Sequence, residues 1–174
     1  MEFIEHSLSV LDPRANGRVV AIVQMSCATK NESDLIQVKE RLLFKHHLKA
    51  VISMPDDLFY PVGVVTCIMV FEANKPNEGR KTWFGYFKDD GFEKRKYIGR
   101  IDARDRYTGL KAKLLSAFKN LDEIPGLSVR HEVTSRDEWC AEAYMDTDYS
   151  TLSASDFDLK IREYCAFKLL SQLD

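Results

Sequence analysis

The sequence predicts an α/β protein with part of a doubly wound, Rossmann-like sheet that ends in an antiparallel hairpin and is followed by a helical C-terminal appendage. Residues 18–25 and 48–54 are short, mostly apolar runs, the first of which indicates a strand buried on both faces, and each follows a segment with apolar residues at helical spacing. This alternation is typical of doubly wound folds. Residues 64–71 form a near-continuous β-branched and aromatic run, which indicates a strand covered on both faces and completes the hairpin.

The helices expected before these strands have different end signals. In residues 2–11 the apolar side chains fall on roughly one face, and Pro13 ends the helix. This helix begins directly at the first residue without a cap, as though the chain were joining a fold already under way. Residues 34–47 carry a leucine and valine stripe, and residues 31–33 offer capping side chains.

The second half of the chain is patterned less regularly. Residues 81–88 are aromatic-rich and expected to be extended, and residues 110–121 form a helix that Pro125-Gly126 closes. A last helix is capped by Ser155 or Asp156 and runs through Leu170. We therefore predict two parts: the C-terminal half of an α/β catalytic domain in residues 1–90, and a mixed helical appendage in residues 91–174.

Composition limits the function classes. The 174 residues are 45% hydrophobic and 30% charged, which is ordinary for a globular protein, and no apolar run of membrane-spanning length occurs. The acidic start and the scattered cysteines favour a cytoplasmic protein with reduced thiols and no metal. The net charge of −2 means that any contact with nucleic acid must be local.

The turn between residues 54 and 64 holds two adjacent aromatic residues, Phe59 and Tyr60, which Pro61 and Gly63 keep out of regular structure. Large rings in a loop favour a binding role. In the alternative interpretation, Phe59 belongs to the core at the end of the sheet and Tyr60 lies on the surface. The adjacent Asp56 and Asp57 are interpreted as solvated turn acids rather than as paired catalytic carboxylates.

The same turn carries a resemblance to a known family. Met54-Pro55-Asp56-Asp57-Leu58-Phe59-Tyr60-Pro61, then Gly63, then Thr66-Cys67-Ile68-Met69-Val70-Phe71, resembles the "LPxxLF…tGvxTxilvf" segment of N6-adenine DNA methyltransferases. The resemblance is strongest to the modification (M) subunits of type I restriction-modification systems. It runs from about Phe3 to about Phe87, with a weaker echo in residues 138–149.

The resemblance implies transfer of a methyl group from S-adenosylmethionine to adenine N6 in DNA. It also implies that an aromatic of this loop, Phe59 or Tyr60, stacks on the extruded base. The family needs a glycine loop for the cofactor and a (D/N)PP(Y/F) tetrapeptide for the adenine. This chain has neither: its eight glycines are scattered, and Leu11-Asp12-Pro13-Arg14 lacks the second proline and the aromatic. We therefore expect the cofactor pocket and the catalytic tetrapeptide to be absent from this chain.

A basic cluster follows the aromatic run. Lys94, Arg95, Lys96 and Arg100 are candidates for contacting DNA phosphates, with tyrosines interleaved among them. Acidic residues interrupt the cluster, so a solvated face of mixed charge is the alternative.

Together these observations predict a fragment or split subunit of a DNA adenine-N6 methyltransferase that contributes the DNA-facing half and is inactive alone. The alternative is a non-enzymatic module, derived from that fold, that binds protein or DNA. The partners implied are DNA, the missing N-terminal half, and the specificity and restriction subunits. A half domain would also expose a sheet edge, through which a homodimer could form.

Overall fold

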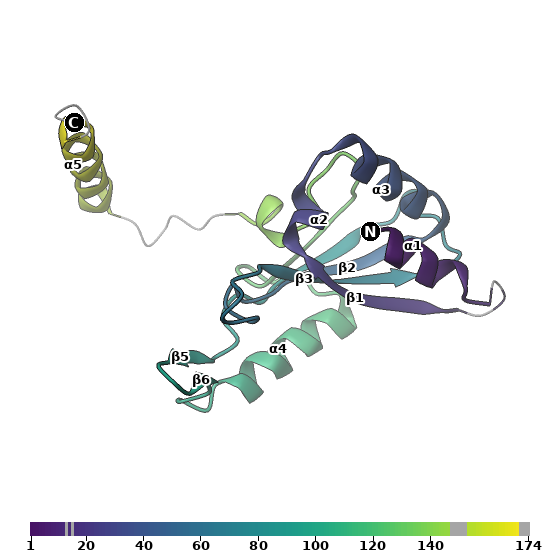
Figure 1. Ribbon diagram of the computed structural model, residues 1–174, viewed down its shortest axis with the longest axis horizontal. Helices are drawn as coiled ribbons and strands as arrows, with labels where there is room; N and C mark the ends of the chain where they lie inside the picture. Colours follow the sequence, from purple (N-terminus) through teal and green to yellow (C-terminus); the bar gives the residue numbers. More distant parts are fainter. Residues whose placement is uncertain (13, 15, 147–152, 171–174) are drawn as a thin grey trace.

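The computed structural model describes residues 1–12, 14, 16–146 and 153–170 (Figure 1). The elements in chain order are α1 (Glu2–Ser9), β1 (Arg18–Gln24), α2 (Met25–Thr29), α3 (Ser33–Lys45), β2 (His47–Ser53), β3 (Thr66–Glu72), β4 (Thr82–Tyr86), β5 (Glu93–Arg95), β6 (Gly99–Ile101), α4 (Tyr107–Asn120), β7 (Ser128–His131), the short 3-10 helix η1 (Ala141–Ala143) and α5 (Ala154–Leu170). Within the described residues, no helix is both long enough and apolar enough to cross a membrane.

The main sheet has five strands in the order β1-β3-β2-β4-β7. Strand β3 lies between β1 and β2 and is antiparallel to both, so that Ile68 faces Ile22 on one side and Ile52 on the other. Strand β4 is parallel to β2, and β7 is antiparallel to β4. Strands β1, β2 and β4 thus share one direction. The predicted α/β class and the antiparallel hairpin onto β3 are confirmed, although most pairings in the sheet are antiparallel.

Helices cover both faces of this sheet (Figure 1). On one face, α1, α2 and α3 pack through a core cluster that includes Leu8 and Phe71. On the other face, α4 contributes Leu114 to a second cluster around the buried Trp83. The indole Nε1 of Trp83 donates a hydrogen bond of 2.9 Å to the carbonyl oxygen of Asp122. That bond gives the one polar atom of the large buried Trp83 ring a partner just after the end of α4.

Strand β1 differs from its prediction. A strand buried on both faces was expected, but its side chains alternate between exposed and half-buried. Val19, Ala21 and Val23 pack on the first core cluster, whereas Val20 and Ile22 are 65% and 59% exposed. The reason is its position: β1 lies at the edge of the sheet, beside β3 alone. Strand β3 does match the prediction, with six of its seven residues buried.

The structure after residue 90 contains strands that the sequence did not predict. Strands β5 and β6 form a separate two-stranded hairpin, and β7 joins the main sheet by pairing with β4. The two hairpin strands are only three residues long and β7 four, too short for an apolar period. The boundary placed at residue 90 remains a prediction.

The last helix, α5, stands apart from the sheet in Figure 1. The side chains of residues 154–169 are all exposed, including six large apolar ones: Phe157, Leu159, Ile161, Tyr164, Phe167 and Leu169. These apolar residues are distributed around the helix rather than along one face.

Candidate nucleic-acid interface

The loop that joins β2 to β3 is folded by its own backbone hydrogen bonds. The amide of Tyr60 donates to the carbonyl of Asp57 at 3.2 Å, and the amide of Val62 donates to the carbonyl of Phe59 at 2.9 Å. Phe59 is 43% exposed and Tyr60 53%, so neither ring is sealed in the core. The loop therefore presents both predicted aromatic residues to solvent at the carboxyl end of β2.

The β5–β6 hairpin lies against this loop. Lys94 Nζ is 4.0 Å from the centroid of the Tyr60 ring. Arg100 Nε is 3.0 Å from Asp57 Oδ1, an ion pair without the angle of a hydrogen bond. The structure thus brings together the aromatic loop and the basic segment, which the sequence predicted separately. We define the candidate interface as the loop of residues 55–63 and the hairpin of residues 93–101.

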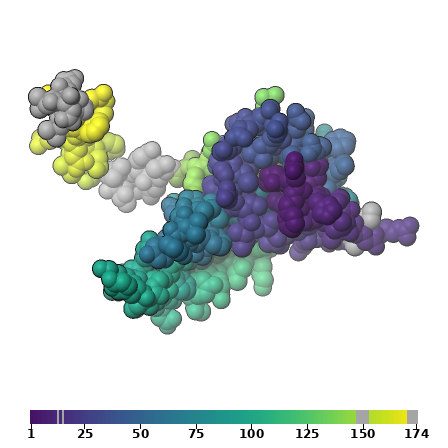
Figure 2. All heavy atoms as spheres, viewed as in Figure 1, coloured from purple at the N-terminus to yellow at the C-terminus, as the bar shows by residue number. Residues whose placement is uncertain are grey.

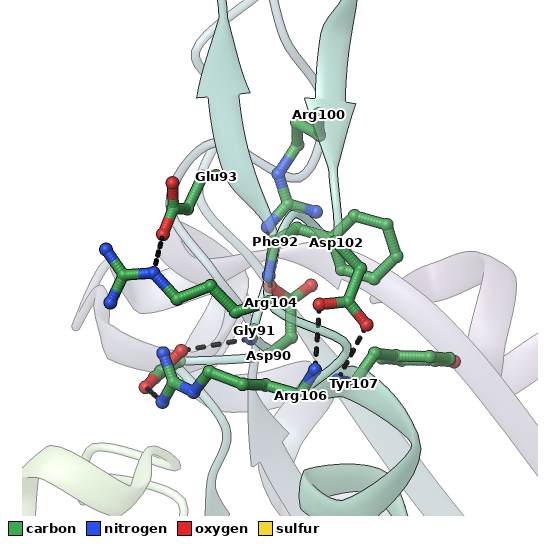
Figure 3. Close-up of polar contacts among 10 residues, drawn as sticks. Asp90, Gly91, Phe92, Glu93, Arg100, Asp102, Arg104, Arg106 and Tyr107 are labelled. Carbon is green, nitrogen blue, oxygen red and sulfur yellow. Dashed lines mark hydrogen bonds and ion pairs between the residues drawn. The ribbon is translucent and has the colours of Figure 1, made fainter.

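The base of the hairpin is fixed by paired charges (Figure 3). Arg100 Nη2 lies 2.7 Å from Asp90 Oδ1, and Arg104 Nε lies 2.9 Å from Glu93 Oε1. Asp102 accepts the backbone N–H groups of Arg106 at 2.8 Å and Tyr107 at 2.9 Å at the start of α4. These two hydrogen bonds hold the pKa of the Asp102 carboxyl below its usual value. The hairpin is therefore tied to α4 as well as to the loop.

The four predicted basic residues differ in their surroundings. The side chain of Arg100 is only 13% exposed and is neutralised by Asp57 and Asp90, so its position is that of an anchor for the hairpin. Arg95 shares the Glu93 carboxylate with Arg104. Lys94 and Lys96 form no ion pair with any residue that the structure describes, and their charges are the ones available to a ligand. The solvated mixed-charge alternative thus describes only part of the segment.

A second polar cluster lies beside the loop, and no pattern in the sequence predicts it. The buried Ser53 donates to Glu142 Oε2 at 2.6 Å, and Lys88 Nζ lies 2.6 Å from Asp56 Oδ1 and 3.4 Å from Glu142 Oε1. Burial lowers the pKa of Lys88, but the carboxylates of Asp56 and Glu142 outweigh it and raise that pKa overall. Asp56 is thus a salt-bridged turn residue, and Lys88 ties the loop to the η1 segment.

The described residues contain no cluster of three His, Cys, Asp or Glu side chains that could hold a metal ion. His46 Nδ1 accepts the amide of Asn74, and His47 Nδ1 contacts the side-chain oxygen of Asn77 at 2.8 Å. Burial raises the pKa of the Cys67 thiol to about 12. This cysteine therefore remains a protonated core residue rather than a nucleophile.

The antiparallel strand β3 lies between β1 and β2, which share one direction, and an aromatic loop follows β2. Fold and site together define a mixed α/β domain with a candidate face for nucleic acid. Comparison with known proteins identifies the family. The N-6 DNA Methylase family matches residues 1–172, and the chain belongs to that family. The resemblance found in the sequence is confirmed.

Individual relatives agree with this assignment. The chain is 32% identical over 173 residues to the type II restriction enzyme and methyltransferase RM.BcgI of Heyndrickxia coagulans. That match covers 97% of this chain but 26% of the relative, so the chain spans about a quarter of that protein's length.

Solved structures share the fold. The methyltransferase subunit of a type I restriction-modification system from Streptococcus thermophilus superimposes with a TM-score of 0.65 at 17% identity, over 83% of this chain and 30% of that one. A structure describing complex assembly and conformational transition of the type I system gives a TM-score of 0.61 at 18% identity, over 99% of this chain and 37% of that one.

Proposed function

We propose that this chain is the DNA-facing, C-terminal part of an adenine-N6 methyltransferase of a restriction-modification system. Family membership supports the reaction class. The observation that carries the proposal is the contact between Lys94 and Tyr60, because it joins the aromatic loop to a lysine of the hairpin that has no ion-pair partner in the described residues. Rings that stack on bases and cations that meet phosphates are the two components of a surface for nucleic acid.

In this proposal the loop residues hold the target base. Enzymes that modify a base rotate it out of the duplex and stack it on aromatic side chains, an interaction worth about 1–3 kcal/mol per base. Phe59 and Tyr60 are both partly exposed and adjacent, and they are our candidates for that stacking role. Lys94 and Lys96 would contact phosphates beside the base, whereas Arg95, a candidate for the same role from the sequence, pairs with Glu93. Arg100 would hold the hairpin in position.

The residues of this chain do not fit a binding site for the cofactor. S-adenosylmethionine requires a glycine loop after a strand, and here β1 passes directly into α2 through Gln24 and Met25 without a glycine. We infer that residues outside 1–174 supply the cofactor pocket and the (D/N)PP(Y/F) tetrapeptide. We also propose a cytoplasmic location, as for other proteins that modify cellular DNA.

The edge strand β1 is our candidate for the junction with that missing part. Its outer edge is unpaired within the described sheet, and Val20 and Ile22 expose apolar surface beside it. Exposed apolar edges of this kind favour strand addition. A strand of the N-terminal half would continue the sheet there, and a second copy of this chain is the alternative occupant.

Helix α5 is our candidate contact for the specificity or restriction subunits. Its side chains are exposed and many are large and apolar, and such a helix gains stability by packing against other helices. The helix would be buried in the assembled complex.

Methyl transfer tests the proposal. The purified chain, mixed with duplex DNA and tritiated S-adenosylmethionine, should transfer no label. Label should appear when the polypeptide encoded by an adjacent gene with the glycine loop and the (D/N)PP(Y/F) tetrapeptide is added. Transfer by the chain alone would contradict the division of the active site proposed here.

The second candidate function is a non-enzymatic module that binds protein or DNA. The exposed β1 edge and the exposed α5 helix favour it, because both are interaction surfaces that need no catalysis. An upstream reading frame that lacks both motifs would support this module over a split enzyme.

A further inference from the structure

The tip of the β5–β6 hairpin is a turn of three residues, Lys96, Tyr97 and Ile98, between the two short strands. Tyr97 is 94% exposed, the highest value for any large apolar side chain in the described residues, and Ile98 is 70% exposed. Figure 2 shows the surface of this region, in teal, projecting from the body of the protein. Two adjacent large and mostly exposed side chains therefore form the end of a protruding arm.

The backbone of the turn is strained at the exposed ring. The amide of Ile98 donates to the carbonyl of Arg95 at 3.3 Å, and Tyr97, the third residue of that turn, has a φ of 66°. A turn with positive φ at this position usually holds glycine or asparagine there. A tyrosine in this conformation costs conformational free energy, and residues held in such conformations concentrate at functional sites.

The arm is held firmly enough to act as a fixed projection. The side chain of Arg100 joins β6 to Asp90 at 2.7 Å and to Asp57 at 3.0 Å, and it lies 5.3 Å from the centroid of the Phe92 ring. Arg104 is paired with Glu93 on the neighbouring strand. The ion pairs in Figure 3 therefore lie at the base of the hairpin, and none of those residues is in the tip.

The charge around the tip selects the partner. Lys96 Nζ lies 5.0 Å from the centroid of the Tyr97 ring and Lys94 precedes it on β5, and neither has an ion-pair partner in the described part of the chain. Large apolar side chains flanked by lysines without ion-pair partners match a ligand that has phosphates on its outside and stacked bases on its inside. Duplex DNA has that construction.

We propose that the hairpin tip is a wedge that inserts Tyr97 and Ile98 into a base step of duplex DNA while Lys94 and Lys96 meet the flanking phosphates. This inference rests on the proposed function and adds to it a second contact beyond the loop of Phe59 and Tyr60. A two-stranded ribbon is narrow enough to enter a groove of DNA. Inserted apolar side chains unstack the step and kink the duplex, most easily at flexible pyrimidine–purine steps. Opening the step beside the target would favour extrusion of the base.

The test uses the 174-residue chain and short duplexes that carry 2-aminopurine at pyrimidine–purine steps. Binding is followed by anisotropy, and unstacking by the rise in 2-aminopurine fluorescence. The wedge variant is Tyr97→Ala/Ile98→Ala, the charge variant is Lys94→Ala/Lys96→Ala, and Phe44→Ala is the control at another exposed aromatic ring. Thermal unfolding of each variant checks that the fold is retained.

We expect the wild type and Phe44→Ala to bind and to increase the fluorescence. The wedge variant should lose most of that increase and bind about tenfold more weakly, with an unchanged salt dependence. The charge variant should bind more weakly with a smaller salt slope. If the wild type binds in a salt-dependent way but the wedge variant gives the same fluorescence as the wild type, the wedge is refuted and the proposed function still stands. Absence of duplex binding by the wild type at low salt refutes both.

Discussion

The Lys94 ammonium lies over the Tyr60 ring, with Nζ 4.0 Å from the ring centroid. Strands β3 and β4 lie between these two residues in the sequence. Their contact links the loop to the hairpin on the side exposed to solvent. On the inner side the same two segments are joined by Asp57 and Arg100. A charged pair and a cation–π pair thus set the position of the basic arm relative to the aromatic loop.

Replacing the Tyr60 ring should weaken DNA binding. Tyr60→Ala removes a base-stacking surface worth about 1–3 kcal/mol and a cation–π contact worth about 0.5–1 kcal/mol at an exposed site. Affinity for duplex DNA, measured by anisotropy, should fall about tenfold. Tyr60→Phe keeps the ring and should bind nearly as well as the wild type. Equal affinity of the alanine variant and the wild type would remove Tyr60 from the interface.

Replacing the anchor of the hairpin should loosen the arm. Arg100→Met leaves the carboxylates of Asp57 and Asp90 without their cation, which should lower local stability by about 1–3 kcal/mol. Limited trypsin digestion should then cut after Lys94 to Lys96 several times faster. Arg95→Met, at a side chain that is 54% exposed, is the matched control and should leave cleavage at the remaining sites unchanged. Unaltered cleavage in Arg100→Met would show that the ion pairs do not order the hairpin.

Strands with long apolar runs could be predicted from the sequence, because burial of β2 and β3 requires them. Strand β1 has the same kind of run, yet it lies at an edge with Val20 and Ile22 exposed. A single sequence cannot distinguish these cases, since an edge that joins another polypeptide carries the same residues as a central strand. The apolar pattern of β1 is consistent with the partner proposed above.

The site was predictable in its parts but not in its assembly. Adjacent rings in a proline-containing loop predicted a binding role for Phe59 and Tyr60, and local positive charge predicted one for the lysines. The contact between the two depends on a hairpin of three-residue strands, for which no apolar period exists. Arg100 appears in the sequence as one more cation, and only its two carboxylate neighbours reveal it as an anchor.

Glu72 should make stability depend on acid pH. Burial raises the pKa of this carboxyl, but Lys49 and Lys75 more than offset it and bring the pKa to about 2 from 4.5. The carboxylate therefore stabilises the folded state above about pH 4.5, and the contribution disappears as the pH falls towards 2. After allowance for the partial exposure of the lysines, we expect about 1–2 kcal/mol. Denaturant unfolding of wild type and Glu72→Gln should differ by this amount at pH 7, and the difference should shrink steadily below pH 4.5.

Lys39 should be a structural residue despite its charge. Its side chain is fully buried, and Nζ donates to the carbonyl oxygens of Ala28 at 2.7 Å and Asp137 at 3.2 Å and lies 4.9 Å from the centroid of the Trp139 ring. Lys39→Ala removes that donor and leaves a cavity, so unfolding should cost about 3 kcal/mol less. Lys39→Met fills the space and should lose less, which equilibrium denaturation would measure.

The pH dependence offers a second check on Lys39. Burial lowers the pKa of its ammonium from 10.5. The unfolded chain then binds the proton more tightly than the folded chain, so the stability of the wild type should rise with pH up to about 10.5. The Lys39→Met variant should lack that rise. An identical alkaline profile in both proteins would mean that the folded lysine titrates as an ordinary one.

The edge of β1 should control association. Val20→Lys/Ile22→Lys places two charges on exposed apolar positions and should leave the thermal stability of the chain nearly unchanged, since neither side chain packs on a core cluster. Light scattering of the wild type should show concentration-dependent self-association that the double variant loses. Leu115→Lys, at a 48% exposed position on α4, is the matched control and should associate as the wild type does. If the double variant self-associates as strongly as the wild type, self-association does not use the β1 edge, because lysines on an edge strand disfavour pairing with another chain.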